Sequence, residues 1–97
     1  MKQAYVYIMS NKNRTTLYVG VTNDIKRRVF EYKFEKNDGF ASKYNISDLL
    51  YFENILGINK AIKREKQLKN WHKEWKWNLI KENNPDLVDL AKDWYIK

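Results

Sequence analysis

Glu65 is the residue whose position suggests chemistry most directly. It lies in a segment with helical periodicity, four residues after Ala61 and three before Leu68, so its carboxylate falls on or beside the apolar stripe. A carboxylate in that place is costly unless it is ion-paired or binds a cation. The residue therefore has three interpretations: a ligand for a cation, the partner of a nearby lysine or arginine, or a side chain that extends outward to solvent.

Arg28 raises the same question on an earlier predicted helix. Ile25, Val29 and Tyr32 recur at helical spacing and mark its inward face, and Arg28 lies on that side, one turn before Tyr32, whereas Arg27 faces solvent. An inward-leaning arginine can stack on a ring, pair with the carboxylate described above, or hold a phosphate with its planar fork.

Two predicted strands contribute tyrosines and a glycine. Tyr5 and Tyr7 of "YVYIM" alternate onto one face of the first strand, and Tyr18 and Gly20 of "LYVGVT" share a face of the second. Aromatic pairs across a hairpin are common core material, but a glycine in a strand often marks a bulge or the close approach of a ligand. Each residue alone has a structural explanation, and the set is more informative than any member.

The charge of the chain predicts a polyanionic partner. Its formal net charge is +7 and its isoelectric point is about 9.6, which for a domain of 97 residues favours nucleic acid, either DNA or RNA. Lysines surround the predicted glutamate helix and would bind phosphates without reading sequence, with a solvated helix face as the alternative. The lysines that we expect to contact nucleic acid are Lys63, Lys66, Lys69 and Lys73.

Nearby tryptophans add a second expectation. Trp71, Trp75 and Trp77 cannot all face one core, so one of them is a candidate for a base-stacking platform or a contact to another chain.

Composition also limits the chemistry and the location. The chain has no cysteine and one histidine, His72, which excludes disulfides, zinc ribbons, thiol nucleophiles and iron–sulfur clusters. A metal must therefore bind oxygen ligands, which favours Mg²⁺, Mn²⁺ or Ca²⁺. No apolar run is long enough to span a membrane, and the N-terminal run is too short for a signal peptide, so we expect a cytoplasmic protein.

The first half of the chain predicts a hairpin followed by a helix and a third strand. Strands are expected at 4–10, 16–22 and 49–55, and a helix at 24–36, with Thr22, Asn23 or Asp24 as its N-cap. Residues 37–45 are expected to form a loop that hinges at Gly39.

The second half predicts two helices and a packed tail. The helices are expected at 60–71, capped by Asn59, and at 73–82, with a break near Asn70 and a stop before Pro85. The tail is expected to form a last turn or short helix whose inward residues are Leu87, Leu90 and Trp94. The order β-β-α-β-α-α predicts one α+β domain over 1–97, a three-stranded, mainly antiparallel sheet flanked by helices. The direction of the third strand does not follow from the sequence.

In this order the residues resemble the GIY-YIG nuclease superfamily, and in particular small stand-alone proteins similar to the N-terminal nuclease domain of the excinuclease C subunit. The resemblance covers about residues 4–90. The first family motif matches "YVY" at 5–7 and the second matches "YVG" at 18–20, with ten residues between them. The family's helix arginine matches Arg28, and its metal-binding glutamate matches Glu65.

Three further positions complete the resemblance. The family's His-or-Tyr position is Tyr32, so no imidazole is available there as a base, and the first glycine of the family motif is Tyr5. The family's late asparagine matches Asn84 best, with Asn83 as the alternative.

The resemblance implies a Mg²⁺- or Mn²⁺-dependent DNA endonuclease, structure-directed or non-specific, with a role in DNA repair or recombination. It implies one ion at Glu65, a phosphate held by Arg28, and a water oriented by Tyr7 or Tyr18, whose phenol pKa Arg28 and the metal would lower. Tyr32 would donate a hydrogen bond, Gly20 would permit close approach, and Asn84 would position a phosphate or steady the site. The alternative is a nucleic-acid-binding module without independent activity. In either case, dimerisation or a protein partner would direct the small domain to its nucleic-acid site.

Overall fold

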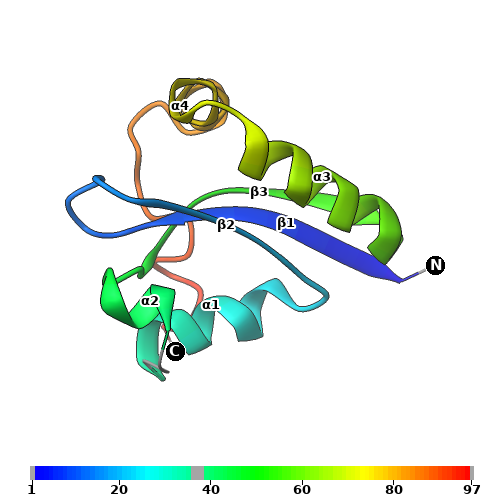
Figure 1. Ribbon diagram of the computed structural model, residues 1–97. Helices are drawn as coiled ribbons and strands as arrows, with labels where there is room; N and C mark the ends of the chain where they lie inside the picture. The colour runs from blue at the N-terminus through cyan, green and yellow to red at the C-terminus, as the bar shows by residue number, and fades with distance from the viewer. Residues whose placement is uncertain (1, 36–38, 97) are drawn as a thin grey trace.

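The computed structural model describes residues 2–35 and 39–96, and its centre is a three-stranded antiparallel sheet. The strands are β1 (Gln3–Ser10), β2 (Leu17–Thr22) and β3 (Asp48–Leu56), in the order β2-β1-β3 (Figure 1). All three were predicted to within one residue at each end, and the direction left open is now fixed, because β3 runs antiparallel to β1. The predicted α+β class is confirmed, and β2 is an edge strand.

The register of the hairpin places the motif residues opposite one another. Tyr7 pairs with Gly20 and Met9 pairs with Tyr18. Because side chains alternate along a strand, all of these side chains except the glycine's project from one face of the sheet. The ladder between β1 and β3 has a register shift after Ile8, and such a bulge bends a strand locally.

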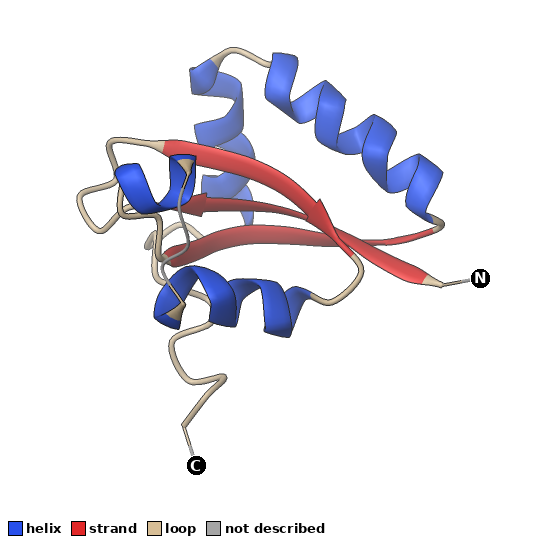
Figure 2. Ribbon diagram, turned by 60° about the horizontal axis from the view of Figure 1, so that its bottom comes forward, coloured by secondary structure: helices blue, strands red, loops and turns tan. Residues whose placement is uncertain are grey.

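Helices cover both faces of the sheet (Figure 2). On one face lie α3 (Ile58–Asn70) and α4 (Lys73–Asn83), packed on a core that includes Val6, Ile8 and Leu68. On the other face lie α1 (Ile25–Phe34) and the C-terminal tail, packed on a second core. That second core contains Tyr7, Met9, Val29, Tyr32 and Leu49. The predicted break near Asn70 is confirmed, and none of the helices in the described ranges has the length and apolar character needed to cross a membrane.

The two predicted N-caps are settled by backbone details. Asp24 is the N-cap of α1, and its side chain accepts a hydrogen bond from the backbone N–H of Arg27. Asn59 is not the N-cap of α3, because the helix begins at Ile58, two residues before the expected start, and Gly57 is its N-cap. Gly57 has a φ of 99°, a conformation that favours glycine and turns the chain from β3 straight into the helix.

The loop predicted at 37–45 contains a short helix, α2 (Phe40–Lys43), that periodicity did not reveal. Residues 37 and 38 of that prediction, and Lys36 at the predicted end of the preceding helix, lie outside the described residues. A single helical turn has too few residues to show a period of 3.6, which explains the omission.

The tail forms turns rather than a helix and crosses from one face of the sheet to the other past β3. The backbone N–H of Leu90 donates to the carbonyl of Leu49 at 2.8 Å, and the N–H of Leu49 donates to Asp89 Oδ1 at 3.0 Å. The other carboxylate oxygen of Asp89 forms an ion pair with Lys33 of α1. As predicted, Leu87, Leu90 and Trp94 pack inward, so the tail fastens α1 against the sheet.

Candidate active site

Tyr7, Tyr32 and Arg28 form a connected chain of side chains between the sheet and α1. The hydroxyls of Tyr7 and Tyr32 are 3.1 Å apart, and Nη2 of Arg28 donates to the Tyr32 hydroxyl at 3.4 Å. The guanidinium carbon of Arg28 also lies 4.7 Å from the centre of the Tyr32 ring, a cation–π contact. The ring of Tyr18 packs 5.9 Å from that of Tyr32, centre to centre. Folding therefore brings together four of the predicted site residues from β1, β2 and α1.

The Tyr7 ring packs directly over the backbone of Gly20. A Cβ built on Gly20 would stand 2.3 Å from the Tyr7 hydroxyl oxygen and 2.4 Å from Cζ, distances that real side chains do not show. The glycine is not at a bulge, since it pairs in the β1–β2 ladder directly opposite Tyr7. Its missing side chain makes room for the phenol of its cross-strand partner, and this is a physical reason for glycine in the second motif.

Glu31 is a site neighbour that sequence reasoning missed. Its Oε1 accepts a hydrogen bond from Nη1 of Arg28 at 2.8 Å. The spacing of three residues on one helix was the available signal, but the expected partner of Arg28 was Glu65. The alternative of an Arg28–Glu65 ion pair is thus not what the structure forms, because each of the two residues pairs within its own helix.

Burial dominates the electrostatics of the two hydroxyls. Desolvation raises the pKa of Tyr7 above its ordinary value of 10, although the hydrogen bond with Tyr32 and the hydrogen bond and charge of Arg28 act in the opposite direction. Arg28 thus lowers the pKa of Tyr7 as expected, but burial outweighs it. Desolvation also raises the pKa of Tyr32, and Tyr7 adds to that increase, so both phenols are neutral at pH 7.

The two phenols share one hydrogen bond, in which either hydroxyl can be the donor. Because burial raises the pKa of both phenols, neither phenolate is favoured in the protein alone.

Glu65 lies on α3, beyond the other face of the sheet. Its side chain is 14% exposed, and its Oε2 is 3.1 Å from Nζ of Lys69. Arg64, the preceding residue, bonds to Glu53 of β3, so that flank of the helix faces β3. Successive helical residues are about 100° apart, which places Glu65 on the flank toward β2. The carboxylate and the tyrosine–arginine chain therefore approach the edge strand β2 from its two faces.

The donor set at Glu65 suits a Mg²⁺ ion that keeps most of its waters. In residues 2–35 and 39–96 no group of three or more Asp, Glu or His side chains gathers as a protein-made cage. Mg²⁺ is commonly bound by one or two carboxylates together with waters and substrate phosphates, so one carboxylate beside a phosphate site is a fitting arrangement. The present partner, Lys69, is 48% exposed and can turn away into solvent.

The four lysines predicted to contact nucleic acid are exposed. Lys63, Lys66 and Lys69 lie on α3, and Lys73 begins α4, where its Nζ donates to the carbonyl of Thr15 at 3.0 Å. Their contact with nucleic acid stays a prediction.

Asn84 lies away from the tyrosine–arginine chain, buried at the C-cap of α4. Its Nδ2 donates to the carbonyls of Leu50 at 3.1 Å and Val88 at 2.8 Å, and its Oδ1 accepts from the N–H of Val88 at 3.2 Å. These bonds tie the end of α4 to β3 and to the start of the tail. The Asn84 amide therefore has a structural role, because it joins α4 to the sheet and to the tail.

We expect Asn84→Ala to lower the free energy of unfolding by about 2–4 kcal/mol, since it leaves buried backbone groups without partners. Asn83→Ala is the matched control. Asn83 is exposed, and its amide donates to the carbonyl of Leu79 in its own helix, so its loss should cost under about 1 kcal/mol. Urea unfolding of both variants checks the difference, and equal costs would contradict this role.

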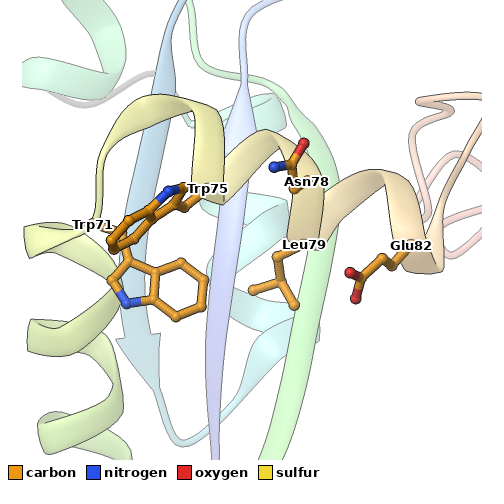
Figure 3. A pocket seen from close by; sticks show the side chains of 5 residues that line it. All are labelled: Trp71, Trp75, Asn78, Leu79 and Glu82. Atoms are coloured by element: carbon orange, nitrogen blue, oxygen red, sulfur yellow. The ribbon is translucent and has the colours of Figure 1, made fainter.

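The three tryptophans separate as expected, with one exposed. Trp71 and Trp77 pack against the core, whereas Trp75 is 52% exposed. Trp71 and Trp75 meet edge to face and line a shallow groove with Asn78, Leu79 and Glu82 (Figure 3). Because Arg64 stacks on Trp71, this groove is on the β3 flank of α3, opposite to the flank of Glu65.

Comparison with known proteins identifies the family. The family model described as "GIY-YIG catalytic domain" matches residues 3–78. A UPF0213 protein of Syntrophus aciditrophicus is 33% identical over 87 residues, which is 86% of this chain and 95% of that protein. A UPF0213 protein of Haloquadratum walsbyi is 34% identical over 82 residues, covering 80% of this chain and 86% of that protein.

A solved structure agrees with the fold. The solution NMR structure of a UPF0213 protein from Bacillus halodurans superposes with a TM-score of 0.56 at 19% identity, covering 98% of this chain and 99% of that one. Together with the paired tyrosine motifs on β1 and β2, the helix arginine and the glutamate of α3, these matches show that the chain belongs to the GIY-YIG nuclease family.

Proposed function

We propose that this protein is a metal-dependent endonuclease that hydrolyses phosphodiester bonds in DNA. One arrangement carries the proposal: the Tyr7–Tyr32–Arg28 chain lies beside β2 on one face of the sheet, and α3, which contacts β2 on the other face, directs Glu65 toward that strand by its helical geometry. An edge strand has no neighbour on its outer side, so a nucleic-acid strand that runs along β2 can reach groups on both faces. The net charge of +7 supports a polyanionic substrate.

Arg28 binds the substrate phosphate in this proposal. Its side chain is 41% exposed and its ion-pair partner, Glu31, is on the same helix, so the guanidinium can turn toward a non-bridging oxygen. That movement breaks its stacking on Tyr32 and uncovers Tyr7, which is only 1% exposed in the protein alone. The fraction of Tyr7 that is ionised as phenolate then accepts a proton from the attacking water and becomes the neutral phenol, and Tyr18 orients that water from β2.

Glu65 would hold the metal, Mg²⁺ or Mn²⁺, together with waters. When bound there, such an ion offsets charge on the scissile phosphate and on the leaving 3′-oxygen. The remaining predicted members support the site: Tyr32 would donate a hydrogen bond to the Tyr7 phenolate, Gly20 makes room for the Tyr7 ring, and Asn84 steadies the fold around it.

A nucleic-acid-binding module without its own activity is the second candidate. It is favoured by the internal pairing of the site, since Arg28 pairs with Glu31 and Glu65 pairs with Lys69. Both candidates predict DNA binding that weakens steeply with salt, so binding alone does not separate them.

Cleavage separates the two candidates. Wild-type protein is incubated with labelled linear, flapped and branched DNA and with a matched RNA, in Mg²⁺, Mn²⁺ or EDTA. The nuclease proposal predicts cutting of at least one DNA that EDTA abolishes. Binding to all substrates without cutting in either metal would favour the binding module.

The pH dependence of cleavage tests the role of Tyr7. Because the pKa of Tyr7 is raised above 10, the phenolate fraction, and with it the cleavage rate constant, should rise about tenfold per pH unit between about pH 6 and 9. Tyr7→Phe should lower the rate and flatten this slope, whereas Tyr18→Phe should lower the rate and keep it. An unchanged slope in Tyr7→Phe would remove Tyr7 as the base and leave hydroxide from solution as the nucleophile.

A further inference from the structure

A hollow of about 350 Å³ lies where the turn between β1 and β2 meets the start of α4. Its lining residues are Thr15, Thr16, Leu17, Tyr44, Lys73 and Lys76. Leu17 is the first residue of β2, directly before Tyr18, so the hollow opens at one end of the strand that carries the candidate active site.

Two ammonium groups share this hollow without a carboxylate. Nζ of Lys73 donates to the carbonyl of Thr15 at 3.0 Å, and Nζ of Lys76 lies 3.5 Å from the carbonyl of Lys69. Across the part of the chain that the structure describes, neither ammonium is in an ion pair with an acidic side chain. Burial, and then the positive charge of Lys73, lower the pKa of Lys76, so the two cations are close enough to repel each other. An anion in the hollow would relieve that repulsion.

The contacts of these lysines connect the hollow to the active site. Lys76 reaches the backbone of Lys69, and Lys69 is the residue whose ammonium pairs with Glu65. Lys69, Lys73 and Lys76 therefore form a line of cations on the β2 side of α3 and α4. A strand that lies along β2 with one phosphate near Glu65 passes this line.

We propose that the hollow binds a backbone phosphate of the nucleic-acid strand whose scissile phosphate lies between Arg28 and Glu65. The ligand class is a phosphodiester, held by the ammonium groups of Lys73 and Lys76 with the threonine hydroxyls that line the hollow as further donors. These groups contact no base edge, so the site fixes the position of the strand without reading sequence. That the phosphate belongs to the nucleic-acid strand rests on the proposed function, since a free phosphate would make the same contacts in the hollow.

Binding measurements in EDTA test the site without cleavage. The double variant Lys73→Gln/Lys76→Gln is compared with Lys81→Gln/Lys92→Gln, which removes the same charge from two exposed lysines that do not line the hollow. With a short DNA duplex, the first variant should bind about tenfold more weakly at low salt. The slope of log K against log salt should fall by about 1–2, whereas the control should change little. Equal losses in the two variants would overturn the proposal.

NMR titration of the wild-type protein identifies the source of the phosphate. DNA in EDTA should shift the backbone amides of Thr15, Thr16, Lys73 and Lys76, and inorganic phosphate should shift the same amides at much higher concentration. Shifts with inorganic phosphate but none with DNA would overturn the assignment to the strand. If DNA shifts these amides but the protein cuts no substrate, the phosphate site stands and the nuclease proposal is rejected. If the protein cuts DNA but DNA shifts none of these amides, the nuclease proposal stands and the phosphate site is rejected.

Discussion

Glu65→Gln should reduce the rate of DNA cleavage at least about 100-fold while the protein stays folded and binds DNA in EDTA. The loss is expected because an amide is a poor ligand for a divalent ion, and an ion on the scissile phosphate contributes several kcal/mol of transition-state stabilisation. Folding should change little, since the exposed Lys69 partner makes an i,i+4 pair worth about 0.3–0.5 kcal/mol. Single-turnover cleavage and thermal unfolding of the same preparation measure the two effects.

Lys69→Gln is the matched control, because it removes the same ion pair and leaves the carboxylate in place. It should weaken DNA binding at low salt and cost less than about tenfold in cleavage. If Lys69→Gln and Glu65→Gln lost activity equally, or if Glu65→Gln unfolded the protein, Glu65 would be a structural residue held by its lysine.

Gly20→Ala should lower the free energy of unfolding by about 1–3 kcal/mol and cleavage by at least about tenfold. The new methyl group would lie 2.3 Å from the hydroxyl oxygen of Tyr7, and that ring is 1% exposed and packed against Tyr32, so it has little freedom to move aside. A displacement of about 1 Å is enough to cost catalysis heavily when Tyr7 is the proton acceptor.

A double-mutant cycle with Tyr7→Leu isolates the cause. In the Tyr7→Leu background the ring is absent, so Gly20→Ala should cost nothing or stabilise by about 0.5–1 kcal/mol, the usual gain of alanine over glycine inside a strand. Equal costs in the two backgrounds would show that Gly20 is required for its backbone and not for the room it gives to Tyr7.

The elements and their order were predictable because each carries its own local pattern. Runs of β-branched and aromatic residues define the strands, and Ile25, Val29 and Tyr32 define the inward face of α1. Arg28 lies half-buried beside that face, whereas Arg27 is exposed. The short α2 was not predictable, because a single turn shows no helical period. The start of α3 directly after Gly57 was not predictable, because it depends on the positive φ of that glycine.

The relations between site residues were less predictable than their identities. The sequence places Tyr7 and Gly20 in two motifs, but only the hairpin register sets them directly opposite each other. Glu31 was missed because a surface pair at i,i+3 has the same pattern in any helix. Arg28 lowers the pKa of Tyr7 as expected, but the net pKa rises because burial, which depends on three packed elements, outweighs Arg28.

The central claim is that Arg28 on one side of β2 and Glu65 on the other act on the same phosphodiester. Single-turnover cleavage of one labelled DNA by the wild type, Arg28→Lys, Glu65→Gln and the double variant tests it most directly. Groups that act as a unit in one transition state have strongly non-additive effects, so the double variant should be about as slow as the slower single variant. Losses that multiply in full, or a wild-type protein that cuts no DNA in Mg²⁺ or Mn²⁺, would contradict the claim.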